Sequence, residues 1–162
     1  MLFRSTTYDI RRARDSLNPS RQCNVMVRAP HGLGADHPYW YARILGVFHA
    51  QVLCIPQPHC KPEIPALYEA QHMEFAWVRW YGNEPDHVSG TGVAQLHKIG
   101  FVPSSDPGAF GFLDPSLIIR ACHLVPSFAD GRTDLLLRQG PSAGRSIGES
   151  LDWTNFYVGW CV

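Results

Sequence analysis

Two stretches of the chain are apolar at successive positions, which is the pattern of a strand that is covered on both faces. The first runs from Asp36 to Phe48 (DHPYWYARILGVF), and the second runs from Phe75 to Gly82 (FAWVRWYG), where Arg79 is the single charge. Aromatic and β-branched residues without polar alternation suit the middle of a sheet. We therefore predict two central strands of one β-domain. In the second strand, Trp80 should face inward together with Ala76 and Val78.

Shorter strand patterns and frequent turns fill the rest of the chain. We expect an extended edge segment at residues 3–12, a turn at 15–18, single helical turns at 66–72 and 134–138, and strands at 24–29, 96–102, 117–125 and 153–162. Four of the thirteen prolines lie in residues 56–65, which excludes that segment from a sheet centre. Short strands separated by turns predict an all-β fold, namely a single small β-barrel with long loops. The domain would span residues 1–162, with its core at about 24–126, an amino-terminal edge strand and a carboxy-terminal closing strand.

The charges balance over the whole chain but not along it. Fourteen Lys and Arg residues match fourteen Asp and Glu residues, so no overall field attracts nucleic acid or anionic lipid. The first thirty residues are nevertheless rich in arginine, and the candidate nucleic-acid contacts there are Arg4, Arg11, Arg12 and Arg14. The alternative is a solvated arm without a partner.

Cysteine usage and hydropathy bear on the compartment. Five cysteines are an odd number, and the first residues lack the apolar run of a signal peptide. We therefore expect reduced thiols in an intracellular protein. Since no apolar stretch reaches the length of a transmembrane helix, we expect no membrane partner.

Neither metal nor catalytic motifs stand out. Cys54, His59 and Cys60 have the wrong spacing for a structural zinc site, and adjacent Cys122 and His123 would point to opposite faces of a strand. We expect no metal and no cofactor. Asp106 and Asp114 each precede a proline, which is typical of turn formers. No nucleophile or phosphate-loop motif is present, so we expect no enzyme.

The aromatic residues are the remaining candidates for a site. Five tryptophans and six tyrosines are numerous, and core packing accounts for most of such residues. The other interpretation is a cage for a cationic group or a platform for a peptide or base. The candidate ligand-binding residues in the two central strands are Trp40, Tyr41, Trp77, Trp80 and Tyr81.

Three of these strand patterns resemble bromo-adjacent-homology (BAH) domains. The segments are YARILGVF at 41–48, AWVRWY at 76–81 and IRACHLV at 119–125, in the order that the family shows them. The resemblance implies a BAH or SH3-like barrel. In members of that family that read methyl-lysine, the cage uses the positions of Tyr41, Trp80 and Gly82. Because the third position is glycine here, Tyr81 or Trp40 would have to supply the third wall.

Nearly the whole chain also resembles the carboxy-terminal module of CACTA-type transposase-like proteins of mushroom-forming fungi. The matching segments are TTYDIRR at 6–12, HPYWYAR at 37–43, AFGFLDP at 109–115, HLVP at 123–126 and FADGRT at 128–133. The resemblance implies a non-catalytic module of a transposon-derived, nuclear protein. The closing apolar strand at 153–162 favours either a module of something longer or a module whose end packs on a partner. Three functions stay open: a reader of chromatin or another protein peptide, a nucleic-acid-binding accessory domain, and a structural scaffold.

The arginine-rich arm generates a prediction about nucleic acid. In strand geometry Arg4 and Arg12 share a face with Tyr8, an arrangement that can contact phosphates and stack a base. We expect weak binding of a single-stranded oligonucleotide, with a dissociation constant of ~10⁻⁴–10⁻⁶ M that rises steeply with salt. Titration of a labelled oligonucleotide at two salt concentrations, with and without Arg4→Ala and Arg12→Ala, checks this. Binding that is absent at low salt, or indifferent to both changes, leaves the arm as a solvated edge.

Overall fold

The computed structural model describes residues 10–11, 16–19, 23–29, 37–53 and 70–159. Strands dominate these ranges, and the only helices among the described residues are three short 3₁₀ turns. The elements are β1 (Ile10–Arg11), β2 (Ser16–Leu17), β3 (Asn24–Arg28), β4 (Tyr39–Leu53), β5 (Ala70–Asn83), η1 (Thr91–Val93), β6 (Lys98–Phe101), β7 (Phe110–Leu113), η2 (Pro115–Leu117), β8 (Ile118–Ala121), β9 (His123–Pro126), η3 (Phe128–Asp130), β10 (Arg132–Thr133), β11 (Asp152–Trp153) and β12 (Phe156–Gly159). The predicted all-β class is confirmed. No helix in the described part of the chain is long and apolar enough to cross a membrane.

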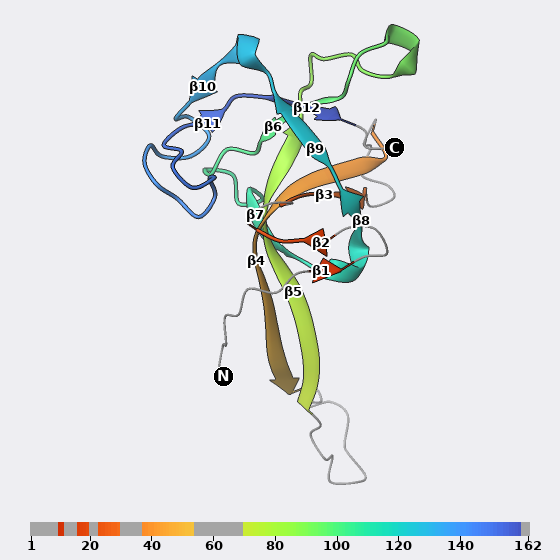
Figure 1. The fold of residues 1–162 in the computed structure, drawn as a ribbon, viewed down its shortest axis with the longest axis vertical. Coiled ribbons are helices and arrows are strands. Elements are labelled where there is room, and N and C mark those ends of the chain that lie inside the picture. Colours follow the sequence, from red (N-terminus) through yellow and green to blue (C-terminus); the bar gives the residue numbers. More distant parts are fainter. Residues whose placement is uncertain (1–9, 12–15, 20–22, 30–36, 54–69, 160–162) are drawn as a thin grey trace.

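One eight-stranded sheet organises the fold (Figure 1). Its strand order is β8-β3-β4-β5-β6-β12-β9, with β7 paired to β5 beside that path. The two predicted central strands are β4 and β5, which pair with each other from Tyr41 and Tyr81 at one end to Leu53 and Ala70 at the other. Two small sheets, β1-β2 and β10-β11, lie outside it.

The two end strands of this sheet are consecutive in the sequence. β8 ends at Ala121 and β9 begins at His123, so Cys122 alone connects the ends of a seven-strand path. A flat sheet would separate these strands by six spacings, or about 29 Å, which one residue cannot span. The sheet therefore curls until its ends approach each other. Among the described strands, no pairing of β8 with β9 closes it into a barrel.

Beyond the body, β4 and β5 continue together as a two-stranded arm (Figure 1). The partner strand β3 pairs with β4 only as far as Arg43, and β7 pairs with β5 from Ala76 to Arg79. The arm therefore comprises the ends of the two long strands, residues 48–53 and 70–75. Of the described strands, β4 and β5 alone pair over this length.

Hydrophobic clusters cover both faces of the sheet. On one face, Ala76 and Val78 of β5 lie in a buried cluster with Ile44 and Val47, and Trp80 packs against that cluster. This confirms the predicted inward alternation of Trp80 with Ala76 and Val78. The opposite face carries a second buried cluster, made by Met26, Tyr41, Tyr81, Ile99, Phe101, Phe156 and Val158. Buried Leu17 and Phe156 extend the core beyond the expected range of 24–126.

A β-bulge at Leu45 changes which residues of β4 face each cluster. Before the bulge, Ile44 pairs with Val78, and after it Gly46 pairs with Trp77. The extra residue moves the even-numbered positions from one face of the sheet to the other, as a bulge does. Val47 therefore faces the same cluster as Ile44, although the two are three residues apart.

Four local predictions were wrong. Residues 117–125 do not form one strand, because the chain leaves the sheet edge at Cys122 and crosses to the opposite end. Ser16–Leu17, predicted as part of a turn, pairs with β1. Residues 70–72 belong to β5, and 134–137 form bends, so neither described segment is helical. In each segment sheet pairing or a buried contact outweighs the local propensity.

The long segment between β10 and β11 has almost no regular structure, and buried charges hold it against β5. The Arg79 guanidinium donates two hydrogen bonds to Asp152, at 3.0 Å to Oδ1 and 2.9 Å to Oδ2. Arg145 approaches the same carboxylate, with its Nε 3.2 Å from Oδ1. These side chains are 0% (Arg79), 0% (Arg145) and 2% (Asp152) exposed.

Main-chain carbonyls of the segment complete this network. Arg145 donates to the carbonyls of Leu137, Arg138 and Gly140, and Arg79 donates to that of Gly144. The Arg79 guanidinium also lies 3.8 Å from the centre of the Phe101 ring, which accepts a cation over its face. A segment that cannot satisfy its carbonyls in a sheet thus satisfies them with two arginines.

Removing the shared carboxylate should destabilise the whole domain. Asp152→Asn leaves two buried guanidinium groups without an anion, and breaking a buried pair in this way costs roughly 3–5 kcal/mol. We expect a loss of that size in the free energy of unfolding, measured by urea denaturation. Asp134→Asn, an exposed position in the same segment, is the control and should change stability by less than about 0.5 kcal/mol. Equal effects of the two changes would contradict the role given to Asp152.

Candidate functional site

The five predicted aromatic site residues do not come together. Trp40 and Trp80 lie on one face of the β4–β5 pair, where both pack against the first cluster. Tyr41 and Tyr81 lie on the other face, buried in the second cluster at 1% and 6% exposure. Trp77 shares that second face but lies towards the arm, beside Phe110. The pair of tryptophans is therefore the candidate site, and the pairing of Tyr41 with Trp80 that the BAH resemblance implies is absent.

The two indoles form perpendicular walls. The ring centres of Trp40 and Trp80 are 5.8 Å apart, and their planes meet at 78°. Both side chains are half-buried, so one ring face of each is supported by the core. Glycine in the neighbouring strand makes room for this arrangement. A Cβ at Gly111 of β7 would lie 2.9 Å from Nε1 of Trp80, so a larger residue there would displace the indole.

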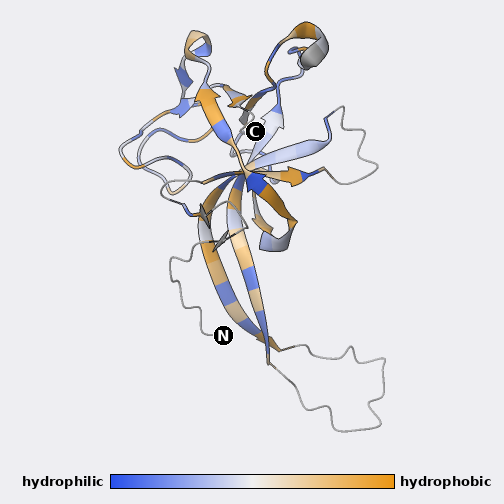
Figure 2. Ribbon diagram, turned by 45° about the vertical axis from the view of Figure 1, so that its right-hand side comes forward, coloured by the Kyte–Doolittle hydropathy of each residue, from blue (hydrophilic) through white to orange (hydrophobic). Residues whose placement is uncertain are grey.

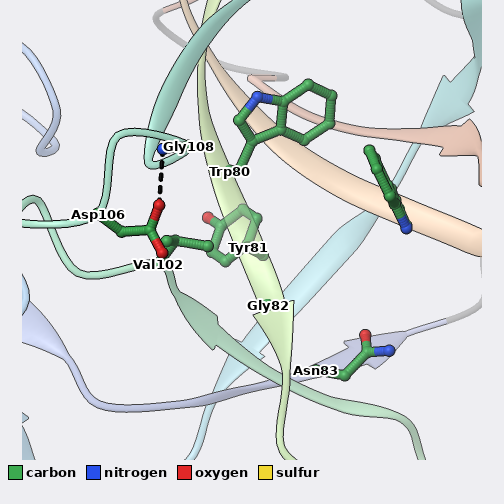
Figure 3. A pocket seen from close by; sticks show the side chains of 8 residues that line it. Trp80, Tyr81, Gly82, Asn83, Val102, Asp106 and Gly108 are labelled. Carbon is green, nitrogen blue, oxygen red and sulfur yellow. Dashed lines mark hydrogen bonds between the residues drawn. The ribbon is translucent and has the colours of Figure 1, made fainter. Parts of the chain in front are cut away.

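The loop from Val102 to Ala109 begins and ends at the main chain of Trp80. The amide of Val102 donates to the carbonyl of Trp80 at 3.1 Å, and the amide of Trp80 donates to the carbonyl of Ala109 at 2.9 Å. This double attachment holds the loop, and Asp106 within it, beside Trp80. Asp106 Oδ1 accepts a hydrogen bond from the amide of Gly108 at 2.7 Å, which fixes the carboxylate (Figure 3).

The indoles and this loop line a pocket of about 500 Å³ that is open to solvent. Its walls come from Trp40, Trp80, Tyr81, Gly82, Asn83, Val102, Asp106 and Gly108. Asp106 is the charged member of this lining. An apolar, aromatic pocket with a few fixed polar groups is the usual form of a ligand site, and its volume lies in the usual range. The adjoining carboxylate favours a cation over an anion.

The buried tyrosines are structural and stay neutral. Burial raises the pKa of both Tyr41 and Tyr81 well above the ordinary value. The Tyr81 hydroxyl donates to Oδ1 of Asn24 at 3.0 Å, which ties β5 to β3. A charged phenolate at either position would be unfavourable, so neither group can serve as a base.

A stacked pair of histidines supports the pocket from behind. The rings of His37 and His97 are parallel within 11°, with centres 3.8 Å apart. His97 donates from Nε2 to Oδ1 of Asn83, and its Nδ1 accepts from the Ser89 hydroxyl, both at 3.1 Å. His37 precedes Trp40 by three residues and Asn83 lines the pocket, so the stack fixes both sides of the site.

Several predicted site residues fall outside the described part of the chain. Arg4, Arg12 and Arg14 lie outside it, and for Arg11 only the backbone, in β1, is described. Cys54, His59 and Cys60 also lie outside it. Among the described residues, no group of three or more His, Cys, Asp or Glu side chains could hold a metal ion. Cys23 and Cys122 are half-buried.

Sequence reasoning missed the polar half of the site. Asp106 was predicted as a turn former, and it does cap the turn at Gly108, but the attachment of its loop to Trp80 has no local signal. His97 and Asn83 lie in different elements and meet only in the fold. The Pro107 and Gly108 that follow Asp106 could have marked a fixed carboxylate, without indicating what it faces.

Comparisons of the chain with family models, with curated proteins and with solved structures found no match.

The buried histidine predicts an acid sensitivity. Burial first, and then the nearby His37 and His87, lower the pKa of His97 from 6.5 to about 4. Between these values the unfolded chain binds a proton that the folded one does not, so stability falls as the pH drops from about 6.5 towards 4. The slope from this group stays below ~1.4 kcal/mol per pH unit, the limit for one proton.

Urea unfolding at pH 7, 6 and 5 tests this histidine. His97→Gln should flatten the decline of stability with falling pH, because the substituted side chain does not titrate. His123→Gln, at an exposed position, is the control for loss of a histidine. The same slope in the wild type and in His97→Gln would assign the acid sensitivity to other groups.

Proposed function

We propose that this chain is a non-catalytic binding module that takes up an alkylated ammonium group of a protein or chromatin peptide in the Trp40–Trp80 pocket. The observation that carries the proposal is the perpendicular pair of indoles, with ring centres 5.8 Å apart, in a pocket whose lining includes the Asp106 carboxylate. A cation over the face of an indole is stabilised by about 0.5–2 kcal/mol, and two such faces act together.

The carboxylate supports a cationic ligand and opposes a phosphate. Asp106 Oδ2 accepts no hydrogen bond among the described residues, so it is available to an N–H of the ligand. No Lys or Arg lines the pocket, and Arg28, whose strand partner is Tyr39, belongs to the opposite face. A nucleic-acid accessory role would therefore use another surface, such as the arginine-rich arm, and stays the second candidate.

The proposal also includes the type of barrel and the kind of protein to which the module belongs. Since the sheet curls until β8 and β9 meet at Cys122, we infer a single BAH or SH3-like barrel with long loops. The sequence resemblance to CACTA-type transposase-like proteins extends the proposal to a module of a nuclear, transposon-derived protein. A structural scaffold without a ligand is the alternative that a failed binding experiment would favour.

Binding of a simple lysine derivative tests the pocket. The probe is N-acetyl-dimethyl-lysine methyl ester, followed through the indole N–H signals in an NMR titration. We expect a dissociation constant of about 1 mM, because one small group without peptide contacts gains only a few kcal/mol. Trp40→Ala and Asp106→Asn should each weaken binding about fivefold or more, since ~1 kcal/mol is a factor of about five.

Matched variants and ligands separate this site from unspecific binding. Asp86→Asn removes an exposed carboxylate outside the pocket and should leave the affinity unchanged. A neutral analogue with an isopropyl group in place of the dimethylammonium group should bind at least fivefold more weakly, since it has the shape without the charge. Gly82→Phe should tighten binding, because a Cβ there meets only Val102, at 3.7 Å, and the ring adds a wall. Equal binding of the charged and neutral probes would contradict the proposal.

A further inference from the structure

The face of β5 opposite the pocket carries a second group of apolar side chains, which we call the aromatic strip. Strand pairing places its members together, since Phe48 pairs with Phe75, Trp77 with Phe112 and Arg79 with Phe110. The strip consists of Phe48, Met73, Phe75, Trp77, Phe110 and Phe112. It runs along the arm and ends where Arg79 enters its buried network.

The strip is continuous, with two of its members exposed to solvent and the other four half-buried. Phe48 stacks on Phe75 with ring centres 5.6 Å apart, and Phe75 meets the edge of Phe112 at 5.3 Å. Phe112 is 73% exposed and Met73 is 52% exposed. Single exposed apolar residues are ordinary, whereas a contiguous exposed patch marks an interaction site.

The arm is amphipathic, so the strip lies on its apolar face and polar side chains lie on the other face. Figure 2 shows hydrophobic and hydrophilic residues alternating along both strands of the arm. The face opposite the strip carries polar pairs, His49 with Glu74 and Gln51 with His72. A two-stranded ribbon is marginally stable alone in water, and packing of its apolar face is the usual remedy. The strip is therefore the side that gains from being covered.

The size of the strip limits the strength of any contact. It spans seven positions of β5, from Met73 to Arg79, and three strands, which is about 24 Å by 14 Å. Two such faces in contact would bury roughly 700 Å², below the ~1,200 Å² of a stable complex. A partner that uses this strip alone binds weakly and reversibly.

We infer that the strip is a self-association surface, which a second copy of this chain covers by two-fold pairing of the arms. The six side chains of the strip are all uncharged, so the strip offers nothing that selects a charged partner, while two identical apolar faces complement each other. The chain has a formal net charge of zero, so two copies meet without long-range repulsion. This surface is separate from the Trp40–Trp80 pocket and leaves it open in the dimer.

Analytical ultracentrifugation over about 10 μM to 1 mM protein tests this inference, since weak interfaces associate in that range. The average mass of the wild type should rise towards twice the monomer mass. Phe112→Ser should weaken association at least tenfold, and Met73→Lys should do the same by placing like charges in the contact. Both positions are exposed, so each variant should keep the wild-type midpoint in urea.

Phe128→Ser is the matched control, because Phe128 is also 73% exposed but lies in η3, away from the strip. It should associate as the wild type does, and so should Trp40→Ala in the pocket. A wild type that stays monomeric up to about 1 mM overturns the inference. Association that Phe128→Ser weakens as much as Phe112→Ser overturns it too, because the contact would then lie elsewhere.

Discussion

The arrangement of the chain depends on one buried interaction, in which two arginines bind the carboxylate of Asp152. It lies between Arg79, in the most central strand, and Arg145, in a segment with almost no hydrogen-bonded secondary structure. Through the two guanidinium groups, one anion fixes five main-chain carbonyls of residues 136–144 against the sheet. Buried ion pairs add little net stability compared with apolar packing, but they are directional. Here the direction matters most, because it sets where a loop without a sheet partner must lie.

Successive side chains of β5 point to opposite faces of the sheet, and this separates the pocket from the aromatic strip, although both use the same strand. Ala76, Val78 and Trp80 face one cluster and lead to the pocket, while Trp77 and its neighbours towards the arm form the strip. Arg79 divides the second face, with buried Tyr81 on one side of it and half-buried Trp77 and Phe75 on the other. The bulge at Leu45 gives β4 the same arrangement of faces. After the bulge Val47 points to the buried cluster, and Phe48 points to the strip.

The sequence predicted the central strands, since unbroken apolar composition is a local property, and it also predicted the face shared by Ala76, Val78 and Trp80. It could not predict the bulge, so a simple period of two would have placed Phe48 on the face of Trp40. It also could not indicate that Arg79 meets Asp152, 73 residues away, or that Cys122 interrupts an apolar run. Of the site, the tryptophans were identifiable by residue type, whereas the part played by Asp106 depends on a loop that closes on Trp80.

The buried network also bears on the charge of the ligand proposed for the pocket. Arg79, Arg145 and Asp152 carry a formal charge of +1, and the Arg79 side chain leaves β5 on the face opposite Trp80. A net positive charge behind the strand opposes a cation in front of it, to an extent that falls with distance and with exposure to solvent. Under the proposal made above, Asp106 in the pocket lining is the group whose charge offsets this opposition. The binding experiment therefore tests the carboxylate as well as the indoles, because aromatic walls alone supply no charge of opposite sign.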